Sequence, residues 1–361
     1  MVSISFMEDK KSNLIILDGI IYSLQRWGGI SNYWNHVRNC INSEFKVLEV
    51  LGVNKIMSDN FVKSAFRPVI EEKILNRKLS LLSSPGFNLR QKYIFHSSYY
   101  RVSRDENALN VVTVHDFTYE LHFSGIKRCF HVLLKRKALK RADYIICISH
   151  YTRQKMFELY PFTRLKSSSV IYNGVEDFIQ GSVDTPFNED GFCMYVGDRR
   201  AEYKNFSLVV DACLLSGESL LIIGGGPLTA KEVRSLSRIN YKFLGFVNDA
   251  KLGAYYSIAK CLLYPSISEG FGIPVIEAQK QGCVVITTTE SCLLEVSGGA
   301  ALFLNELTPE ALAKCLKRVN HSKEEMMRLR ELGIKNSRRF SWSRTRNETM
   351  SVYEGLLKSG I

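Results

Sequence analysis

The chain has 361 residues, of which 45% are hydrophobic and 23% charged, and these proportions exclude an intrinsically disordered or collagen-like protein. A chain of this length favours two domains of middling size. It contains no apolar run of the roughly 18 residues needed to span a membrane, and residues 1–11 are too charged for a signal peptide, so we expect a cytoplasmic protein. Its nine cysteines include no Cys-x-x-Cys pair, so neither a disulfide framework nor a metal site is indicated.

Basic residues outnumber acidic residues by 48 to 36, which gives a formal net charge of +12 at pH 7. The excess is uneven, because residues 1–180 contain 26 basic and 16 acidic residues whereas the remainder contains 22 and 20. A positive field of this kind suits an anionic partner. A phosphate-bearing substrate, an acidic membrane surface and nucleic acid all stay open on charge alone.

Short apolar runs alternate with longer polar stretches of helical character along the whole chain. Runs that are apolar on both faces are typical of buried parallel strands. They lie at 13–18, 111–115, 144–149 and 170–172 in the first half, and at 192–196, 219–223, 241–244, 261–264 and 283–287 in the second. Two successive β/α/β sets predict an α/β protein with two doubly wound, Rossmann-like domains.

The stretch 174–190 is rich in small and polar residues and lacks apolar periodicity, which indicates a linker. We therefore expect an N-terminal domain over residues 1–180 and a C-terminal domain over residues 190–339. Residues 340–361 have a helical pattern, and this helix could cross back to the N-terminal domain.

Two features of the N-terminal half lie where an α/β sheet places functional groups. Gly28 and Gly29 follow the first strand and precede a helix, so their amides could bind a phosphate. The spacing Gly-x-Gly-x-x-Gly is absent, which excludes a dinucleotide-binding loop. His115 and Asp116 end an apolar strand, at the edge where open α/β sheets hold ligands. A lone histidine is usually structural, but at the C-terminal end of a strand a functional role is equally favoured, so both interpretations stay open.

A basic segment covers residues 126–142 and reads IKRCFHVLLKRKALKRA. It contains seven lysines and arginines and no acidic residue, and its apolar residues recur near helical spacing. The pattern predicts a basic amphipathic helix. One interpretation is a solvated helix face, and the other is contact with anionic lipid.

A basic loop follows the first strand of the C-terminal half and contains Arg199, Arg200 and Lys204. The loop is either a solvated basic surface or a site for an anionic group, for which paired cations provide fixed positive charge without a metal. Two later strands end in glycine, at 224–226 and at 245, and such positions are either turns or ligand-binding edges.

The most informative segment, 268–277, reads SEGFGIPVIE. Its glycines allow close backbone approach to a ligand, and a helix starting near Pro274 would direct its amides and the positive end of its dipole toward that ligand. Glu269 in the loop and Glu277 in the helix could accept hydrogen bonds from different hydroxyls of one polyol. The alternative is a turn with two solvated glutamates.

The pair Glu269 and Glu277, with seven residues between them that include Phe-Gly-x-Pro, resembles the signature of the retaining glycosyltransferases of family 4. Members of this family have the GT-B fold, two Rossmann-like domains that face a central cleft. The other motifs follow in the family's order, from the glycine turn to Phe340-Ser-Trp342. The resemblance implies an acceptor-binding N-terminal domain and a C-terminal domain that binds a nucleotide sugar.

The resemblance also implies roles for single residues. It assigns catalytic contacts with the donor sugar or its diphosphate to His115, Arg199 or Arg200, Lys204 and Glu269, and ribose binding to Glu277. The remaining donor-binding positions that it implies are Gly28, Gly29, Asp116, Gly225, Phe246, Val247, Gly270, Phe271, Gly272 and Ile273. No metal or other cofactor is expected. No carboxylate is placed as a nucleophile, so the family's front-face route, in which the leaving phosphate helps to deprotonate the acceptor, is implied.

The start of the chain and its size resemble bacterial transferases that build O-antigen or capsular polysaccharide with mannosyl- or rhamnosyl-type sugars. We therefore expect a retaining hexosyltransferase, with a mannose-like sugar first, a nucleotide diphosphate sugar as donor and a lipid-linked glycan of lipopolysaccharide biosynthesis as acceptor. Such a protein could bind peripherally to the inner face of the cytoplasmic membrane. The alternatives are a sugar-nucleotide epimerase of the same fold and, less favoured, a polyanion-binding protein. Nucleic acid is not an expected partner, because no recognised module interleaves aromatic and basic residues.

Overall fold

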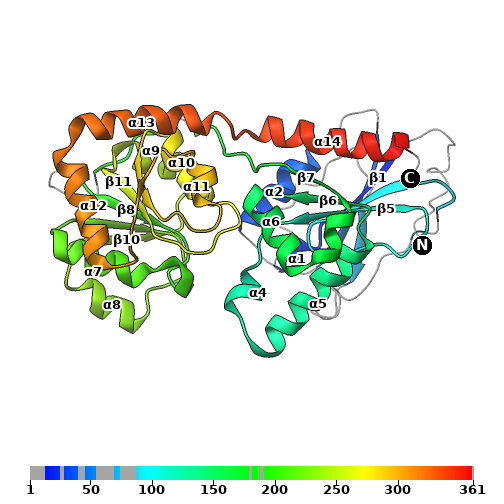
Figure 1. Cartoon of the computed structure of the whole chain (residues 1–361), viewed down its shortest axis with the longest axis horizontal. Helices are drawn as coiled ribbons and strands as arrows, with labels where there is room; N and C mark the ends of the chain where they lie inside the picture. The colour runs from blue at the N-terminus through cyan, green and yellow to red at the C-terminus, as the bar shows by residue number, and fades with distance from the viewer. Residues whose placement is uncertain are drawn as a thin grey trace. The chain divides into compact units, whose positions relative to one another are not determined.

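The computed structural model describes residues 13–24, 28–39, 45–53, 69–73, 87, 89–178, 181–185, 187 and 191–359. The chain divides into two compact units, which can be followed in Figure 1 by the colours that mark residue number. Unit 1 comprises Met1–Gly174 and Trp342–Ile361, and unit 2 comprises Val175–Ser341. The division falls at the start of the expected linker 174–190, and Phe178 and Phe187 of that stretch pack with the core of unit 2.

Parallel strands form the centre of unit 1. The described residues contain a seven-stranded sheet in the order β3-β2-β1-β4-β5-β6-β7, in which all neighbouring strands pair in parallel. The strands are β1 (Leu14–Asp18), β2 (Lys46–Val53), β3 (Val69–Lys73), β4 (Tyr93–Ser97), β5 (Ala108–Val114), β6 (Tyr144–Cys147) and β7 (Ser167–Val170). Strands β1, β4 and β5 are buried along their whole length, as expected for a sheet covered on both faces.

Helices cover both faces of this sheet. They are α1 (Ile21–Leu24), α2 (Gly29–Arg38), α4 (Thr118–His122), α5 (Gly125–Arg141), α6 (His150–Leu159), the 3-10 helix η3 (Pro161–Leu165) and α14 (Trp342–Ser359). One core joins α2 and α14 through Trp34, Tyr353 and neighbouring apolar side chains, and another joins α5 and α6 through Leu134 and Met156. The C-terminal helix therefore belongs to unit 1. The hydroxyl of Thr345 in this helix also donates a hydrogen bond to the carbonyl of Tyr172 at 2.7 Å.

Unit 2 repeats the architecture with fewer strands. Its described residues form a six-stranded parallel sheet in the order β10-β9-β8-β11-β12-β13. The strands are β8 (Cys193–Val196), β9 (Leu220–Ile223), β10 (Tyr241–Gly245), β11 (Cys261–Tyr264), β12 (Val284–Thr287) and β13 (Leu302–Phe303). Two doubly wound parallel sheets confirm the predicted α/β class.

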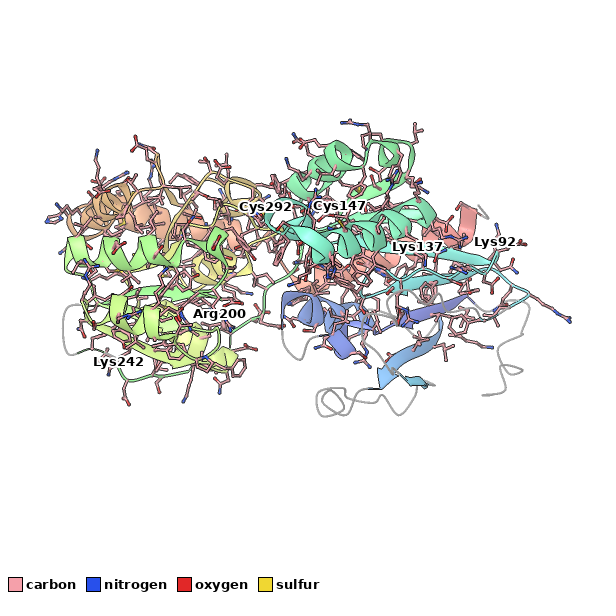
Figure 2. All side chains as sticks on the ribbon, turned by 90° about the horizontal axis from the view of Figure 1, so that it is seen from below. Lys92, Lys137, Cys147, Arg200, Lys242 and Cys292 are labelled. Carbon is pink, nitrogen blue, oxygen red and sulfur yellow. The ribbon has the colours of Figure 1, made fainter. Side chains whose placement is uncertain are left out.

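Helices also cover both faces of the second sheet. They are η4 (Glu202–Lys204), α7 (Phe206–Ser216), α8 (Ala230–Leu236), α9 (Asp249–Ile258), α10 (Ile273–Lys280), α11 (Leu293–Ser297), α12 (Pro309–His321) and α13 (Lys323–Ser337). Helices α7 and α12 share one core, whereas α9, α10 and α11 share the other. The cysteines in the described part of the chain are free thiols and, except for Cys129, they are buried, as are Cys147 and Cys292 (Figure 2).

The apolar runs locate most strands but not all of them. Strands β2, β3, β4 and β13 were not among the predicted runs, and the strand predicted at 170–172 is wrong in position, because β7 ends at Val170. The β7 residues Ser167 to Ser169 are too polar to signal a strand, and pairing with β6 places them in the sheet. No helix in the described ranges is long and apolar enough to cross a membrane.

Candidate active site

The loop that joins β11 to α10 contains the two signature glutamates of unit 2. Gly272, directly before α10, adopts φ +85°, and a Cβ there would lie 2.8 Å from the side chain of Leu293. Both the backbone conformation and the close packing therefore require glycine. Helix α10 begins at Ile273 with proline in its first turn, so its first amides have no partner within the helix and face the loop.

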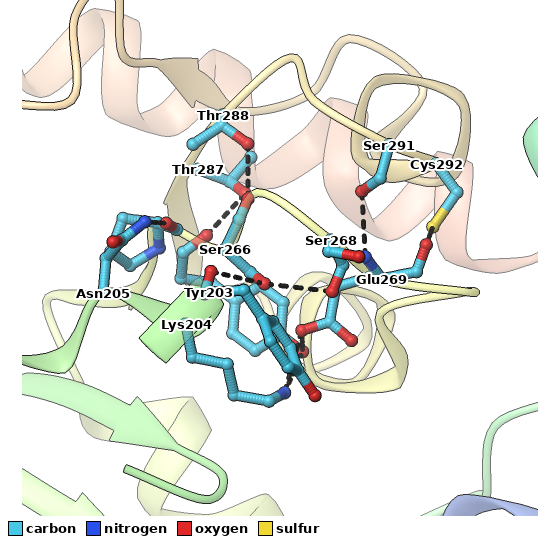
Figure 3. A network of polar contacts seen from close by, with 12 residues as sticks. Tyr203, Lys204, Asn205, Ser266, Ser268, Glu269, Thr287, Thr288, Ser291 and Cys292 are labelled. Atoms are coloured by element: carbon cyan, nitrogen blue, oxygen red, sulfur yellow. Dashed lines mark hydrogen bonds and ion pairs between the residues drawn. The ribbon is translucent and has the colours of Figure 1, made fainter. Parts of the chain in front are cut away.

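Glu269 lies in this loop and makes a short network with side chains from two neighbouring strand ends (Figure 3). Its Oε1 accepts hydrogen bonds from Lys204 Nζ and from the hydroxyl of Tyr264, each at 2.8 Å. Its backbone amide donates to Ser291 Oγ at 3.2 Å. The Lys204 and Glu269 side chains are 15% and 14% exposed, so the ion pair is largely shielded from water.

Hydrogen bonds between two loops hold Lys204 in place (Figure 3). Asn205 adopts φ +53°, and its Nδ2 donates to the carbonyl of Pro265 at 2.8 Å. The amide of Ile267 donates to the carbonyl of Tyr203 at 2.9 Å. The loops after β8 and β11 are therefore tied together, which fixes the cation of one beside the carboxylate of the other.

The two candidate arginines have opposite environments. Arg199 is buried, with Nε donating to Glu232 at 2.9 Å and its two terminal nitrogens donating to the carbonyls of Gly224 and Gly226 at 2.7 and 2.6 Å. Arg200 (Figure 2) is 57% exposed and forms an ion pair with the exposed Asp198. The donors of Arg199 therefore already hold the glycine turn, whereas the guanidinium of Arg200 faces solvent.

The glycine turn after β9 lies beside the end of β10. Gly224 donates its amide to the carbonyl of Gly245 at 2.7 Å, so the turns after β9 and β10 are adjacent. At Gly225, with φ +72°, an added Cβ would lie 2.7 Å from the Arg199 guanidinium. The ring of Phe246 is 74% exposed, whereas Val247 packs against the core formed by α9 and α10.

Glu277 lies in α10 on a half-buried site. Its Oε2 accepts a hydrogen bond from the hydroxyl of Tyr256 at 3.2 Å. Burial raises the pKa of Glu277 to about 7, the Tyr256 bond opposes this shift, and the charges of Asp249 and Glu176 add to it. A carboxylate that is weakly satisfied in this way gains from hydroxyl donors of a ligand.

The rest of the signature loop has mixed environments. The Phe271 side chain is buried and meets Phe340 edge-on, with ring centroids 5.6 Å apart. Only the backbone of Phe271 can therefore meet a ligand. Gly270 and Ile273 are half-buried, and Gly272 is buried.

Unit 1 holds the remaining predicted site residues. His115 is buried directly after β5, and its ring meets the ring of Tyr33 edge-on at 4.9 Å. Tyr33 belongs to α2, which begins at Gly29, so the exposed glycine turn and His115 are linked through one helix. Burial lowers the pKa of His115 to about 4, so the imidazole is neutral at pH 7. Asp116 accepts the amide of Thr118 at 2.9 Å.

The basic segment 126–142 is helical, as predicted, but its cations do not all face outward. Lys135 is 2% exposed and forms an ion pair with Glu120 at 2.8 Å, so this lysine of the segment faces neither solvent nor lipid. Sequence reasoning missed Glu120 and Tyr264 as partners of site residues. No local pattern marks either of them, although Tyr264 ends a predicted strand. Among the described residues, no group of three or more His, Cys, Asp or Glu could hold a metal ion.

Solved structures share the fold of this chain. The sucrose-phosphate synthase tll1590 from Thermosynechococcus elongatus superposes with a TM-score of 0.76 at 15% identity, covering 97% of this chain and 100% of that chain. Anabaena Alr3699/HepE, solved in complex with UDP and glucose, gives 0.70 at 14% identity over 96% and 100%. Together with the two parallel sheets, these likenesses define a GT-B fold.

Two family models match consecutive parts of the chain. The model described as glycosyl transferases group 1 matches residues 182–336, and the one described as glycosyltransferase family 4 matches residues 91–177. The chain is therefore a glycosyltransferase of the family 4 type, and the resemblance seen in its motifs is confirmed.

The names of two relatives indicate which kind of glycosyltransferase this chain resembles. The O-antigen chain mannosyltransferase B of Escherichia coli is 26% identical over 73% of this chain and 74% of its own length. The O-antigen chain mannosyltransferase RfbU of Salmonella typhimurium is 27% identical over 60% and 62%. The chain is thus similar to O-antigen mannosyltransferases.

Proposed function

We propose that this protein is a retaining hexosyltransferase that moves a mannose-like sugar from a nucleotide diphosphate to a lipid-linked glycan during O-antigen or lipopolysaccharide biosynthesis. The observation that carries the proposal is the Lys204–Glu269 pair, a cation and a sugar-binding carboxylate 2.8 Å apart beside the start of α10. The similarity to O-antigen mannosyltransferases supports the sugar and the pathway class.

The donor binds to unit 2 in this proposal. Glu277 accepts hydrogen bonds from the ribose hydroxyls, and the exposed ring of Phe246 stacks on the base. Lys204 and Arg200 neutralise the diphosphate, and amides at Gly270 to Ile273 support the sugar near Glu269. Two side-chain cations supply the positive charge that the leaving group needs, so transfer needs no metal.

The chemistry is an exchange of one bond for another at the anomeric carbon. The bond from that carbon to the phosphate oxygen breaks as a bond to the acceptor oxygen forms on the same face, which retains the configuration. The acceptor proton passes to the departing phosphate oxygen. Lys204 and Arg200 stabilise the charge that develops on the diphosphate. Glu269 hydrogen-bonds the sugar and does not attack it.

The residues of unit 1 have the roles that the resemblance to the family implies. Neutral His115 hydrogen-bonds the donor sugar or its diphosphate, Asp116 orders the loop that follows, and the amides at Gly28 and Gly29 face the phosphate. A lipid-linked acceptor agrees with the +12 net charge of the chain, which attracts it to anionic surfaces.

The exposed part of α4 and α5 provides a membrane surface in this proposal. Ile126 is 90% exposed and Leu133 is 64% exposed, an arrangement in which apolar side chains enter a lipid interface. The exposed cations Lys127 and Lys140 on the same helix attract anionic headgroups. The protein then acts at the cytoplasmic face of the inner membrane, where a lipid-linked acceptor is available.

A panel of nucleotide sugars tests the proposal. Thermal stabilisation is measured with GDP-mannose, several UDP-sugars and free diphosphates, for the wild type and for Glu277→Ala. We expect one nucleotide class to stabilise the wild type and the variant to lose that response. Transfer is then followed with a lipid-linked acceptor, and NMR of the product reports its anomeric configuration. No response to any nucleotide, or an inverted product, would overturn the proposal.

The epimerase alternative is tested in the same samples. An epimerase converts the donor sugar without any acceptor, whereas a transferase requires the acceptor. The two relatives named above are mannosyltransferases, which supports a transferase over an epimerase.

A further inference from the structure

One lysine of the basic helix α5 points into unit 1 rather than into solvent. The Nζ of Lys135 donates to the backbone carbonyl of Asp116 at 2.7 Å and to the Glu120 carboxylate at 2.8 Å. Asp116 directly follows His115, so the ammonium holds the backbone of the loop on which His115 stands. Lys358, on α14 of the same unit, is exposed and offers a matched comparison.

The surroundings of Lys135 leave little freedom for either partner. The ammonium lies 4.4 Å from the centroid of the Phe117 ring and 5.3 Å from that of Tyr100. The second strong donor to Glu120 is the hydroxyl of Tyr160, at 2.8 Å. The cation, its carboxylate and the loop therefore form one closed hydrogen-bonded group.

A buried ion pair of this kind is a weak source of stability. Removing two charges from water offsets most of their attraction, and well-packed apolar residues often replace such a pair without loss. What an apolar residue cannot do is donate a hydrogen bond to the Asp116 carbonyl. The specific contribution of Lys135 is therefore the position of the loop.

We propose that Lys135, held by Glu120, is a positioning residue that orients His115 and Asp116 for glycosyl transfer. This inference rests on the proposed function, because it takes His115 as a contact of the donor. Lys135 acts through the Asp116 backbone and touches neither the sugar nor the phosphate.

The charges that face His115 agree with this role. Burial is the main cause of its low pKa of about 4, Asp116 opposes the shift, and Lys135 adds to it. Among the described residues, His96 of β4 and Tyr33 of α2 also face it. Burial therefore keeps the imidazole neutral, the bond from Lys135 to the Asp116 carbonyl holds its loop in place, and loss of Lys135 raises the pKa of His115.

The test compares Lys135→Met with Lys358→Met, and uses Lys135→Arg as the conservative variant. We expect Lys135→Met to lower kcat/KM for the acceptor by about tenfold or more, as misplaced groups do. Donor Kd changes less than kcat/KM, because most of the proposed donor contacts belong to unit 2. Lys358→Met leaves both constants unchanged, and Lys135→Arg recovers part of the activity because it keeps the cation.

If Lys135→Met does not fold, the double variant Lys135→Met with Glu120→Met takes its place, since it removes both buried charges together. Titration of the His115 ring by NMR, assigned with His115→Gln, is the second readout. We expect a higher His115 pKa in the variants without Lys135 and no change in Lys358→Met. An unchanged His115 pKa, or an unchanged kcat/KM, would overturn the inference.

The two proposals fail in different ways. A wild-type protein that transfers no sugar would contradict the proposed function, whereas the NMR titration would still show whether Lys135 controls His115. A wild-type protein that transfers sugar equally well without Lys135 would contradict only the inference.

Discussion

The ammonium of Lys204 lies 2.8 Å from Oε1 of Glu269, although the two residues are 65 positions apart in the chain. They meet because β8 and β11 are neighbours in a parallel sheet, so the loops at their carboxyl ends share one edge. In the unliganded chain each charge satisfies the other. In the proposed function, a donor with a diphosphate and sugar hydroxyls would offer both groups new partners, so that binding would exchange one ion pair for two contacts with the ligand.

The first prediction concerns this pair. Lys204→Met weakens binding of the nucleotide diphosphate sugar by about 1.5–3 kcal/mol, the usual contribution of a hydrogen bond to a charged group. Isothermal titration calorimetry measures this as a rise in Kd of about ten- to a hundredfold. Glu269→Gln keeps the shape of the side chain and should lower kcat more than it changes donor Kd. Equal Kd values for the wild type and Lys204→Met would contradict a phosphate role for Lys204.

The second prediction separates Arg199 from Arg200. Arg199→Met breaks a buried ion pair and leaves two carbonyls unsatisfied, so the free energy of unfolding should fall by about 3 kcal/mol or more. Arg200→Met should leave stability almost unchanged, because its ion pair with Asp198 is exposed. Chemical denaturation measures both effects.

The same two variants separate the roles in binding. Arg200→Met should weaken free diphosphate as well as the complete donor, since the guanidinium binds the phosphate. A stable Arg199→Met protein with weakened diphosphate binding, beside an Arg200→Met protein that binds normally, would reverse this assignment.

The third prediction follows from Glu277, whose pKa is raised from 4.5 to about 7 chiefly by burial. The folded chain holds this proton more tightly than the unfolded chain, so the contribution to stability is complete below pH 4.5 and is lost as the pH rises through 7. Glu277→Gln should therefore lose less stability between pH 5 and pH 8 than the wild type.

Nucleotide binding should release the same proton. Ribose hydroxyls donate to the ionised carboxylate and lower its pKa, so binding near pH 6.5 sets free a fraction of a proton. Calorimetry in two buffers of different ionisation enthalpy measures that fraction. Glu277→Gln serves as the control, and equal proton release by this variant would assign the effect to another group.

The fourth prediction concerns the exposed surface of α5. Reversing the charges of Lys127 and Lys140 to glutamate should weaken binding to vesicles that contain phosphatidylglycerol by at least about tenfold, given about 1 kcal/mol for each basic residue near the surface. Ile126→Ser with Leu133→Ser should weaken binding at high salt as well, because the apolar contribution is not screened. Sedimentation with vesicles measures both variants.

Two exposed lysines of α12 provide the matched control for charge. Lys314→Glu with Lys317→Glu changes the net charge by the same amount on unit 2 and should leave vesicle binding nearly unchanged. Equal losses in the two charge-reversed proteins would show that net charge, rather than the α5 surface, controls binding.

Local patterns were enough to predict the class of fold and the chemistry-bearing loops. Buried parallel strands are apolar on both faces, so their runs stand out, and turns that approach a ligand need glycine wherever it occurs. The serine-rich β7 and the short β13 carry no such signal, and pairing with neighbouring strands creates them. The start of α14 was likewise visible, but its place on unit 1 depends on the core around Trp34 and Tyr353.

By itself, the sequence determined that two doubly wound domains form and that Glu269 and Glu277 stand on one loop and helix. Only the tertiary structure decided that Arg199 is buried whereas the adjacent Arg200 is exposed. It also decided that Lys135, one of several basic residues in the same helix, points inward to the carbonyl of Asp116. The reason is that burial is set by contacts from distant segments. Glu232 and the glycine turn enclose Arg199, and Glu120 encloses Lys135, whereas no local pattern distinguishes these side chains from those beside them.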